Sequence, residues 1–146
     1  MLALVQRVRE ARVEVAGQVV GAIGRGLLVF VCAEPQDGPS QVQRLVDKLV
    51  KLRILADASG RMNRSVVDTA GGLLLVSQFT LAADTSGGNR PGFSGAAPPE
   101  QGRALYEAVL AEVRARHAPV EAGRFGADMQ VHLVNDGPVT IPLTVR

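Results

Sequence analysis

Two short polar segments stand where apolar runs of the chain end, and their side chains could act on a substrate. The first, Ser77-Gln78-Phe79-Thr80, directly follows the apolar run 73–76. Ser and Thr hydroxyls and the Gln amide both donate and accept hydrogen bonds. The backbone amides of Ser77 and Gln78, at such a turn, could also bind an oxyanion. An ordinary strand end with turn hydroxyls is the alternative interpretation of this segment.

The second segment is Asn135-Asp136-Gly137-Pro138-Val139-Thr140. Only about 5–6% of X-Pro bonds are cis in folded proteins, but a native cis bond is a deliberate feature. In the cis form the carbonyl oxygens near Gly137 and Pro138 would turn toward one side. Such a rigid pair of acceptors could bind an ammonium group or exclude a substituent from a neighbouring carbon. An ordinary trans turn is the alternative.

The chain contains few residues that could form other kinds of catalytic site. We find no nucleophile-elbow, Walker, dinucleotide-binding or zinc-protease motif. Two His and one Cys leave few ligands for zinc, and one Cys excludes an internal disulfide. His117 is expected at a helix end, where a cation complements the helix dipole. His132 is expected to pack within a strand and Cys32 within the core. Neither a metal nor a cofactor is expected.

The charged and aromatic residues restrict the class of partner. Sixteen Lys and Arg against 14 Asp and Glu give a net charge of +2. Fourteen of these cations are Arg, which binds phosphate through two parallel hydrogen bonds, although codon bias also explains the excess. One Tyr, four Phe and no Trp argue against a base-stacking platform. No apolar run approaches the roughly 20 residues that span a bilayer. We expect a cytoplasmic protein with neither a membrane nor DNA as partner.

Hydrophobic patterning predicts the elements that position the two polar segments. Strands are expected over 2–15, 19–23, 27–32 and 73–76. Two or three further short strands are expected within 120–145, with a corner at Gly137-Pro138.

Two main helices separate these strands. The first has Ser40 as its predicted N-cap, with Gln43 completing a capping box, and ends near 51–53. The second opens at Pro98-Pro99 and ends before Pro119. The class is α+β: a small, mixed or antiparallel, barrel-like sheet with two main helices packed outside. Residues 1–146 fit one domain.

Together, the two polar segments and their surroundings resemble the D-aminoacyl-tRNA deacylase family, of the D-tyrosyl-tRNA deacylase type. The resemblance covers the whole chain. It is carried by residues 3–8, 24–29, 51–54, 62–63, 76–81, 90–94, 123–129 and 135–140. Family members often have an aromatic residue where this chain has Ala82 and a serine where it has Gly92, which puts in doubt only local contacts near that loop.

The resemblance implies a homodimer that hydrolyses the ester joining a D-amino acid, or glycine, to the 3′-terminal adenosine of tRNA. This activity is proofreading in translation. It implies a pocket at the dimer interface, with Ser77, Gln78, Phe79 and Thr80 from one subunit as the catalytic segment. A Gly-cis-Pro dipeptide from the other subunit, here Gly137-Pro138, would reject L-residues. The resemblance also assigns supporting roles in the pocket to Arg7, Phe125 and Met129.

Two mechanisms remain for the chemistry. Thr80 could be a nucleophile, but no base is evident to activate it. The favoured alternative is that the terminal ribose 2′-OH assists water while the Ser77 and Gln78 amides stabilise the oxyanion. Two rival functions also remain: a tRNA-binding module without catalysis, and a general hydrolase of small esters.

Overall fold

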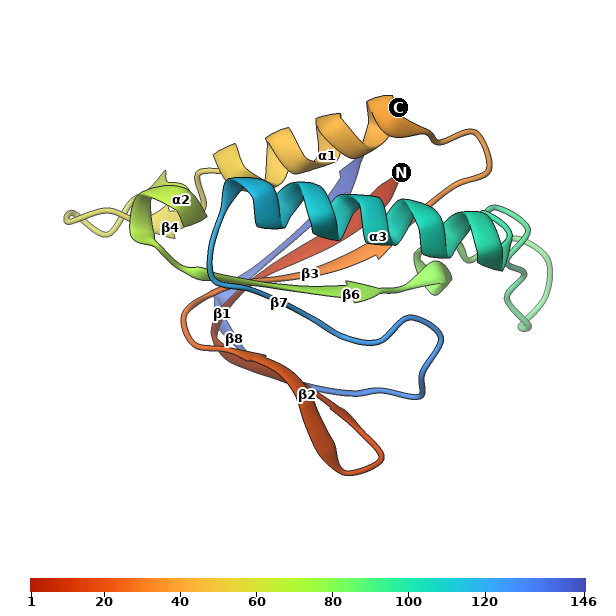
Figure 1. Cartoon of the computed structure of the whole chain (residues 1–146), viewed down its shortest axis with the longest axis horizontal. Helices are drawn as coiled ribbons and strands as arrows, with labels where there is room; N and C mark the ends of the chain where they lie inside the picture. Colours follow the sequence, from red (N-terminus) through yellow and green to blue (C-terminus); the bar gives the residue numbers. More distant parts are fainter.

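The apolar runs of the sequence form one mixed sheet covered by two long helices. The structure, a computed structural model, describes all residues from Met1 to Arg146. Figure 1 shows its elements in chain order: β1 (Leu2–Val15), β2 (Gln18–Ile23), β3 (Gly26–Cys32), α1 (Pro39–Lys51), β4 (Leu55–Ala56), β5 (Met62–Arg64), α2 (Val66–Thr69), β6 (Gly72–Ser77), the 3-10 turn η1 (Phe79–Ala82), α3 (Pro99–Arg116), β7 (Val120–Ala122) and β8 (Gln130–Thr144).

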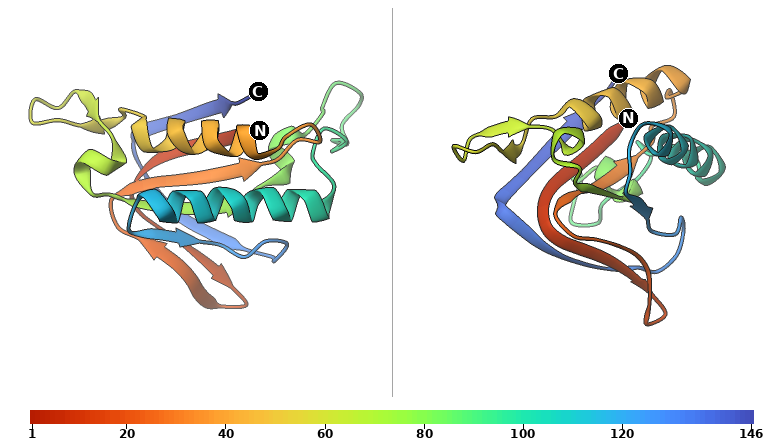
Figure 2. Two further views of the ribbon diagram at one scale, coloured as in Figure 1. Left: turned by 45° about the horizontal axis from the view of Figure 1, so that its top comes forward. Right: turned by 60° about the vertical axis from the view of Figure 1, so that its left-hand side comes forward.

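The sheet curls because one long strand, β1, is shared between partners. Its order is β2-β1-β3-β6-β7, and β8 pairs with β1. β1 pairs with β3 through its first half and with β2 through its second half, and it bends strongly between them (Figure 2). A Cβ added to Gly21 of β2 would lie 2.6 Å from the carbonyl oxygen of Ala122 in β7. The two outer strands therefore meet closely, and the predicted barrel-like sheet is confirmed.

The central strands β3 and β6 are buried on both faces of the sheet. Along β6, Leu73 and Leu75 join the core beneath the helices, whereas Leu74 and Val76 join a second core inside the curl. This alternation is what successive side chains of a strand must do. It explains why β3 and β6 are nearly continuous apolar runs, as the sequence analysis predicted.

Helix α1 begins earlier than predicted. Its N-cap is Gly38, not Ser40, and the side-chain oxygen of Gln41 accepts a 2.8 Å hydrogen bond from the Gly38 N–H. Pro39 occupies the first helical position, where its missing N–H costs nothing. The predicted apolar stripe is present, with buried residues Val42, Leu45, Val46, Leu49 and Val50.

The C-terminal part has two strands within 120–145, as predicted, but one of them is long. β7 is short, whereas β8 runs over residues 130–144, and its pairing with β1 is interrupted between Asn135 and Thr140, at the predicted corner. β8 lies at the edge of the sheet, where a proline is tolerated because the backbone on the outer side of the strand has no neighbouring strand to pair with.

The two ends of the chain meet beside the start of α1. The Met1 ammonium is fully buried and donates to Glu34 Oε2 at 2.9 Å, Asp37 Oδ1 at 2.9 Å and the Val145 carbonyl at 2.7 Å. This cluster fixes β1 against the loop that leads into α1. None of the helices combines the length and the apolar composition needed to cross a membrane.

Candidate active site

A largely apolar cavity of about 460 Å³ opens at the carboxyl ends of β3 and β6. Because these strands are parallel, Cys32 and Ser77 end side by side, and Ser77 extends the β6 face that carries Leu73 and Leu75 toward the helices. The start of α3 closes the other side. The lining consists of Val31, Cys32, Ala33, Ser77, Gln78, Phe79, Phe93, Ala96, Ala97, Pro98, Pro99, Gly102, Tyr106, Phe125 and Gly126.

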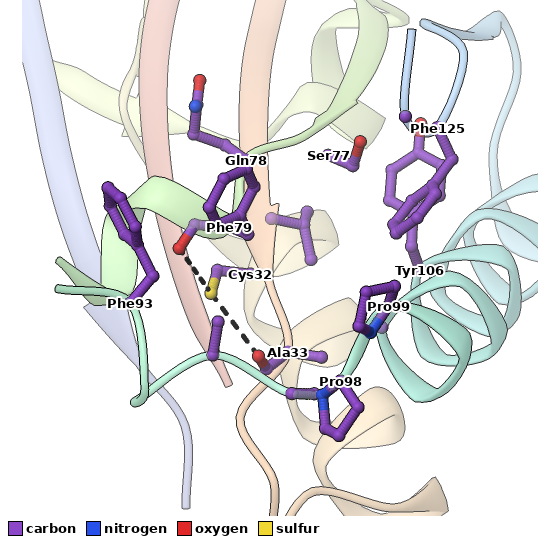
Figure 3. Close-up of a pocket in the computed structure, with 15 residues that line it drawn as sticks. Cys32, Ala33, Ser77, Gln78, Phe79, Phe93, Pro98, Pro99, Tyr106 and Phe125 are labelled. Atoms are coloured by element: carbon purple, nitrogen blue, oxygen red, sulfur yellow. Dashed lines mark hydrogen bonds between the residues drawn. The ribbon is translucent and has the colours of Figure 1, made fainter.

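Aromatic rings form two walls of this cavity (Figure 3). Phe79 and Phe93 pack edge to face with ring centres 5.1 Å apart, although their side chains are 57% and 36% exposed. Across Cys32, the rings of Tyr106 and Phe125 lie 6.0 Å apart, and the Arg103 guanidinium lies 4.8 Å above Phe125. An exposed aromatic pair next to a cavity is a surface on which a planar group can pack.

The backbone of the Ser77–Thr80 segment departs from the predicted oxyanion site. The Gln78 N–H donates to the Val31 carbonyl at 2.8 Å, which continues the β3–β6 pairing. It is therefore not free to bind a substrate, and that part of the prediction is wrong. The Phe79 and Thr80 N–H groups stand instead at the start of η1, where the first amides have no partner within the turn.

The side chains of this segment offer no base. Gln78 Nε2 donates to Thr80 Oγ1 at 2.5 Å, and Thr80 itself does not line the cavity. No carboxylate, histidine or lysine is among the lining residues. The two titratable groups present both stay neutral near pH 7. Burial raises the pKa of the Cys32 thiol above its usual value and that of Tyr106 to about 12.

The Gly137-Pro138 segment forms a braced loop within β8. The peptide bond between the two residues is cis, and Gly137 has φ +123°. Arg7 donates from Nε to the Asp136 carbonyl at 3.1 Å and from Nη1 to the Ile54 carbonyl at 2.9 Å. Asn135 Nδ2 donates to the carbonyls of Arg7 at 3.0 Å and Val139 at 3.1 Å, which closes the base of the loop.

Within one chain, this loop and the cavity are far apart. Arg7, which contacts Asp136, pairs with Leu27 near the start of β3, whereas Ser77 pairs with Val31 near its end. The four-residue step along β3 from Leu27 to Val31 spans about 13 Å at the usual rise of a strand. Gly137 and Pro138 do not line the cavity. Within a chain, the two polar segments therefore lie toward opposite ends of β3.

The remaining predicted residues separate into two groups. Phe125 lies in the cavity wall with Ser77, Gln78 and Phe79. Met129 is not among the lining residues. Its Sδ would lie 2.7 Å from a Cβ at Gly123, and it packs against the core inside the curl.

The residues considered for other chemistry have structural contacts. His117 ends α3 and its Nε2 is 2.6 Å from the Gly71 carbonyl oxygen. His132 lies in β8, with Nε2 2.8 Å from Glu14 Oε2. Cys32 is buried as predicted, but it also lines the cavity. No three His, Cys, Asp or Glu side chains lie close enough together to form a metal site.

Sequence reasoning missed several lining residues. Phe93, Pro98, Pro99 and Tyr106 reach the cavity from a loop and a helix that follow Ser77–Thr80 in sequence. The Pro-rich segment signalled a functional loop or the start of a helix, but nothing in it indicated which strand end it would cover. Asn135 was part of the second motif, yet its two backbone contacts depend on the β1–β8 register.

Comparison with known proteins identifies the class to which this α+β barrel-like fold and its cavity belong. The family model for D-Tyr-tRNA(Tyr) deacylase matches residues 4–144. Curated proteins named D-aminoacyl-tRNA deacylase are similar along almost the whole chain. The one from Methylibium petroleiphilum is 69% identical and that from Aromatoleum aromaticum is 70% identical, each covering 99% of this chain and 95% of the relative.

Solved structures agree on the fold. One described as "c-Myc DNA Unwinding Element Binding Protein" has a TM-score of 0.95 and 42% identity, covering 100% of this chain and 99% of the other. A probable eukaryotic D-amino acid tRNA deacylase has a TM-score of 0.81 at 18% identity, covering 97% of both chains, and shows the fold alone. The chain belongs to the D-Tyr-tRNA(Tyr) deacylase family, whose members are hydrolases of the aminoacyl-tRNA ester bond.

Proposed function

We propose that this protein hydrolyses the ester bond of D-aminoacyl-tRNA, and that of mischarged glycyl-tRNA, to release the amino acid and free tRNA. Family membership supports the reaction. The observation that carries the site is the apolar cavity at Ser77–Phe79, which contains no ionised side chain. Such a cavity suits an ester that is already activated, because amide donors and a fixed geometry suffice to lower its barrier.

We further propose that the active protein is a homodimer in which each cavity is completed by the Gly137-Pro138 loop of the partner subunit. The loop lies toward the opposite end of β3 from the cavity of its own chain, and this separation supports the arrangement. The loop carbonyls would stand close to the amino group and Cα of the substrate. An L side chain would point into them, whereas a D side chain would point away and glycine would have nothing to clash.

For the chemical step we propose that the terminal ribose 2′-OH activates water and that the N–H group of Phe79, which lines the cavity, holds the developing oxyanion. That amide lies at the start of η1, where the turn leaves it without an acceptor. Thr80 then acts by accepting a hydrogen bond from the Gln78 amide, not as a nucleophile. Replacing the terminal 2′-OH by hydrogen is expected to lower the rate by about 10²- to 10⁴-fold, the range of general acid–base assistance.

The substrate's binding surface follows from the aromatic walls. Phe79 and Phe93 are the exposed rings, and we propose that the 3′-terminal adenine packs on the wall that they form. Phe125 belongs to the opposite wall of the cavity. Arg7 positions the loop, and Met129 supports the Gly123 backbone from the core side.

Residues 1–146 form one deacylase domain, because both cores share β3 and β6. A cytoplasmic location is part of the same proposal.

Two measurements separate this function from its rivals. Purified protein is expected to release the amino acid from D-aminoacyl-tRNA much faster than from the ethyl ester of the same D-amino acid. Equal rates on both esters would indicate a general hydrolase of small esters. Binding of tRNA without any release of amino acid would indicate a non-catalytic module.

A further inference from the structure

We propose that a cationic surface at the C-terminal end of α1 binds the phosphate backbone of the tRNA substrate; this inference rests on the proposed function. The α1 cationic surface comprises the six basic residues between positions 44 and 64: Arg44, Lys48, Lys51, Arg53, Arg61 and Arg64. It includes both lysines of the chain. All six residues are exposed.

Charge is concentrated here well beyond the average of the chain. Residues 44–64 contain six cations and two acids, a net charge of +4, whereas the whole chain carries +2. The rest of the chain is therefore net negative, at −2. A local excess of this kind gives a positive potential that attracts a polyanion.

The two acids of this segment are already engaged. Asp47 pairs with Arg116 Nη1 at 2.6 Å, from outside the segment. Asp57 accepts from the N–H groups of Ser59 at 2.8 Å and Arg61 at 3.0 Å, which closes its own turn. Both carboxyl groups have a lowered pKa, chiefly through side-chain hydrogen bonds from Arg116 and Ser59 respectively, and remain ionised at neutral pH.

By contrast, the central cations have no acidic partner. None of the ion pairs in the structure includes Lys48, Lys51 or Arg53. Lys48 and Lys51 lie in the last turn of α1, where cations also complement the helix dipole. That explanation does not extend to Arg53, which follows the helix, or to Arg64 in β5.

The surface is also shaped to receive anions. Two hollows of about 440 and 450 Å³ adjoin one another and share Lys51 and Arg53 in their walls. Arg44 and Lys48 also line the first hollow together with Asp47, and Arg116 lines the second together with Asp68, so cations outnumber carboxylates in both walls. Guanidinium and ammonium groups around such hollows suit successive phosphates, the first through paired hydrogen bonds and the second as a point charge.

The position of this surface agrees with the proposed dimer. Ile54, next to Arg53, accepts the Arg7 hydrogen bond, and Arg7 also contacts Asp136 before Gly137. The surface thus adjoins the loop. Figure 1 shows the C-terminal end of α1, together with α2 and β4, at the opposite end of β3 from the cavity of the same chain. With the loop seated at the partner's cavity, the surface flanks the tRNA whose 3′ end the partner holds.

The test combines Lys48→Gln, Lys51→Gln and Arg53→Gln in one variant. Its substrates are D-aminoacyl-tRNA and the matching 3′-D-aminoacyl adenosine, which has the same ester but no phosphate group. The ratio of kcat/KM for the tRNA to kcat/KM for the adenosine ester is expected to fall about tenfold or more. Binding of uncharged tRNA, followed by fluorescence anisotropy, should lose about two to three from its slope of log K against log salt concentration.

A matched variant controls for the loss of charge alone. Arg12→Gln also removes an Arg, here a partly exposed one, but Arg12 lies on β1 beside Glu14 and His132, away from α1. It should leave both the ratio and the slope unchanged. Unfolding midpoints of both variants confirm folding. An unchanged ratio and slope in the triple variant would overturn this inference while wild-type activity remains. Wild type that hydrolyses neither substrate would instead overturn the proposed function.

Discussion

The Arg7 guanidinium holds the carbonyl of Asp136 at 3.1 Å, directly before Gly137. The same side chain reaches Ile54, so one residue ties the loop both to β1 and to the segment after α1. Arg7 is only 15% exposed, and lysine cannot make both contacts with one ammonium group.

We therefore expect Arg7→Lys to lower the free energy of unfolding by about 1–3 kcal/mol, the range for hydrogen bonds of charged groups. It should also raise hydrolysis of L-aminoacyl-tRNA, because the loop would no longer be held in position. Denaturant titration and a deacylation assay measure the two effects. Arg25→Gln is the matched control, because Arg25 is 71% exposed and lies 3.9 Å from Asp136. Equal effects of both substitutions would contradict the role given to Arg7.

Gly137 has no room for a side chain. A Cβ there would lie 2.9 Å from Arg7 Nη2 and 3.0 Å from Val139 Cγ2, at a φ of +123°. Gly137→Ala should cost about 1–3 kcal/mol of stability and weaken the rejection of L-aminoacyl-tRNA, since Arg7 must move away from Asp136. Gly24→Ala is the control, because nothing lies within 4 Å of its added Cβ. If Gly137→Ala still spares L-aminoacyl-tRNA as wild type does, the loop does not set chirality.

Thr80 has a hydroxyl but no base to activate it. Its Oγ1 accepts from Gln78 Nε2, and the cavity offers no ionised group. Thr80→Ala is expected to keep kcat/KM for D-aminoacyl-tRNA within about threefold of wild type, because Thr80 does not line the cavity and its hydroxyl is not the nucleophile. Single-turnover rates are the appropriate measurement. A loss on the order of 10³-fold or more would identify Thr80 as the nucleophile.

Tyr106 should make stability fall at high pH. Burial raises its pKa to about 12, whereas the unfolded chain has the ordinary value of 10.0. The neutral phenol therefore stabilises the fold fully below pH 10, and that contribution is lost as pH rises toward 12, up to roughly 2–3 kcal/mol.

Tyr106→Phe tests this dependence. At neutral pH it should cost at most about 1 kcal/mol, since the Leu75 carbonyl that Tyr106 contacts also accepts from the Gly123 N–H. Denaturant titrations at pH 7, 10 and 11.5 should show a smaller alkaline loss for the variant than for wild type. Equal losses of stability at high pH in the variant and in wild type would mean that Tyr106 does not cause the alkaline loss.

The sequence was sufficient for the elements whose signals are local. The runs in β3 and β6 are apolar on both faces, so any register would bury them. The sequence was not sufficient where neighbouring residues or strands determine the bounds of an element. Ser40 is a good N-cap by type, but Pro39 sets the first helical position one residue before it. The corner predicted at Gly137-Pro138 is present as an interruption of the pairing between β8 and β1, yet one strand continues on both sides of it.

Part of the cavity lining was predicted, namely Ser77, Gln78, Phe79 and Phe125, but its geometry was not. The Gln78 amide is lost as an oxyanion donor because β6 pairs with β3 one residue further than the apolar run, a register that no residue type reveals. The distance between the Ser77–Thr80 segment and the Gly137-Pro138 loop likewise depends on the pairing of β1 with β3 and β8.

Matched D- and L-aminoacyl-tRNA, carrying the same amino acid on the same tRNA, test the central claim most directly. With purified protein, the D-ester should be hydrolysed and the L-ester should remain intact over the same period. Glycyl-tRNA should be hydrolysed as well, since it has no side chain to meet the loop. Hydrolysis of both the D- and L-esters, or of neither, would contradict the account.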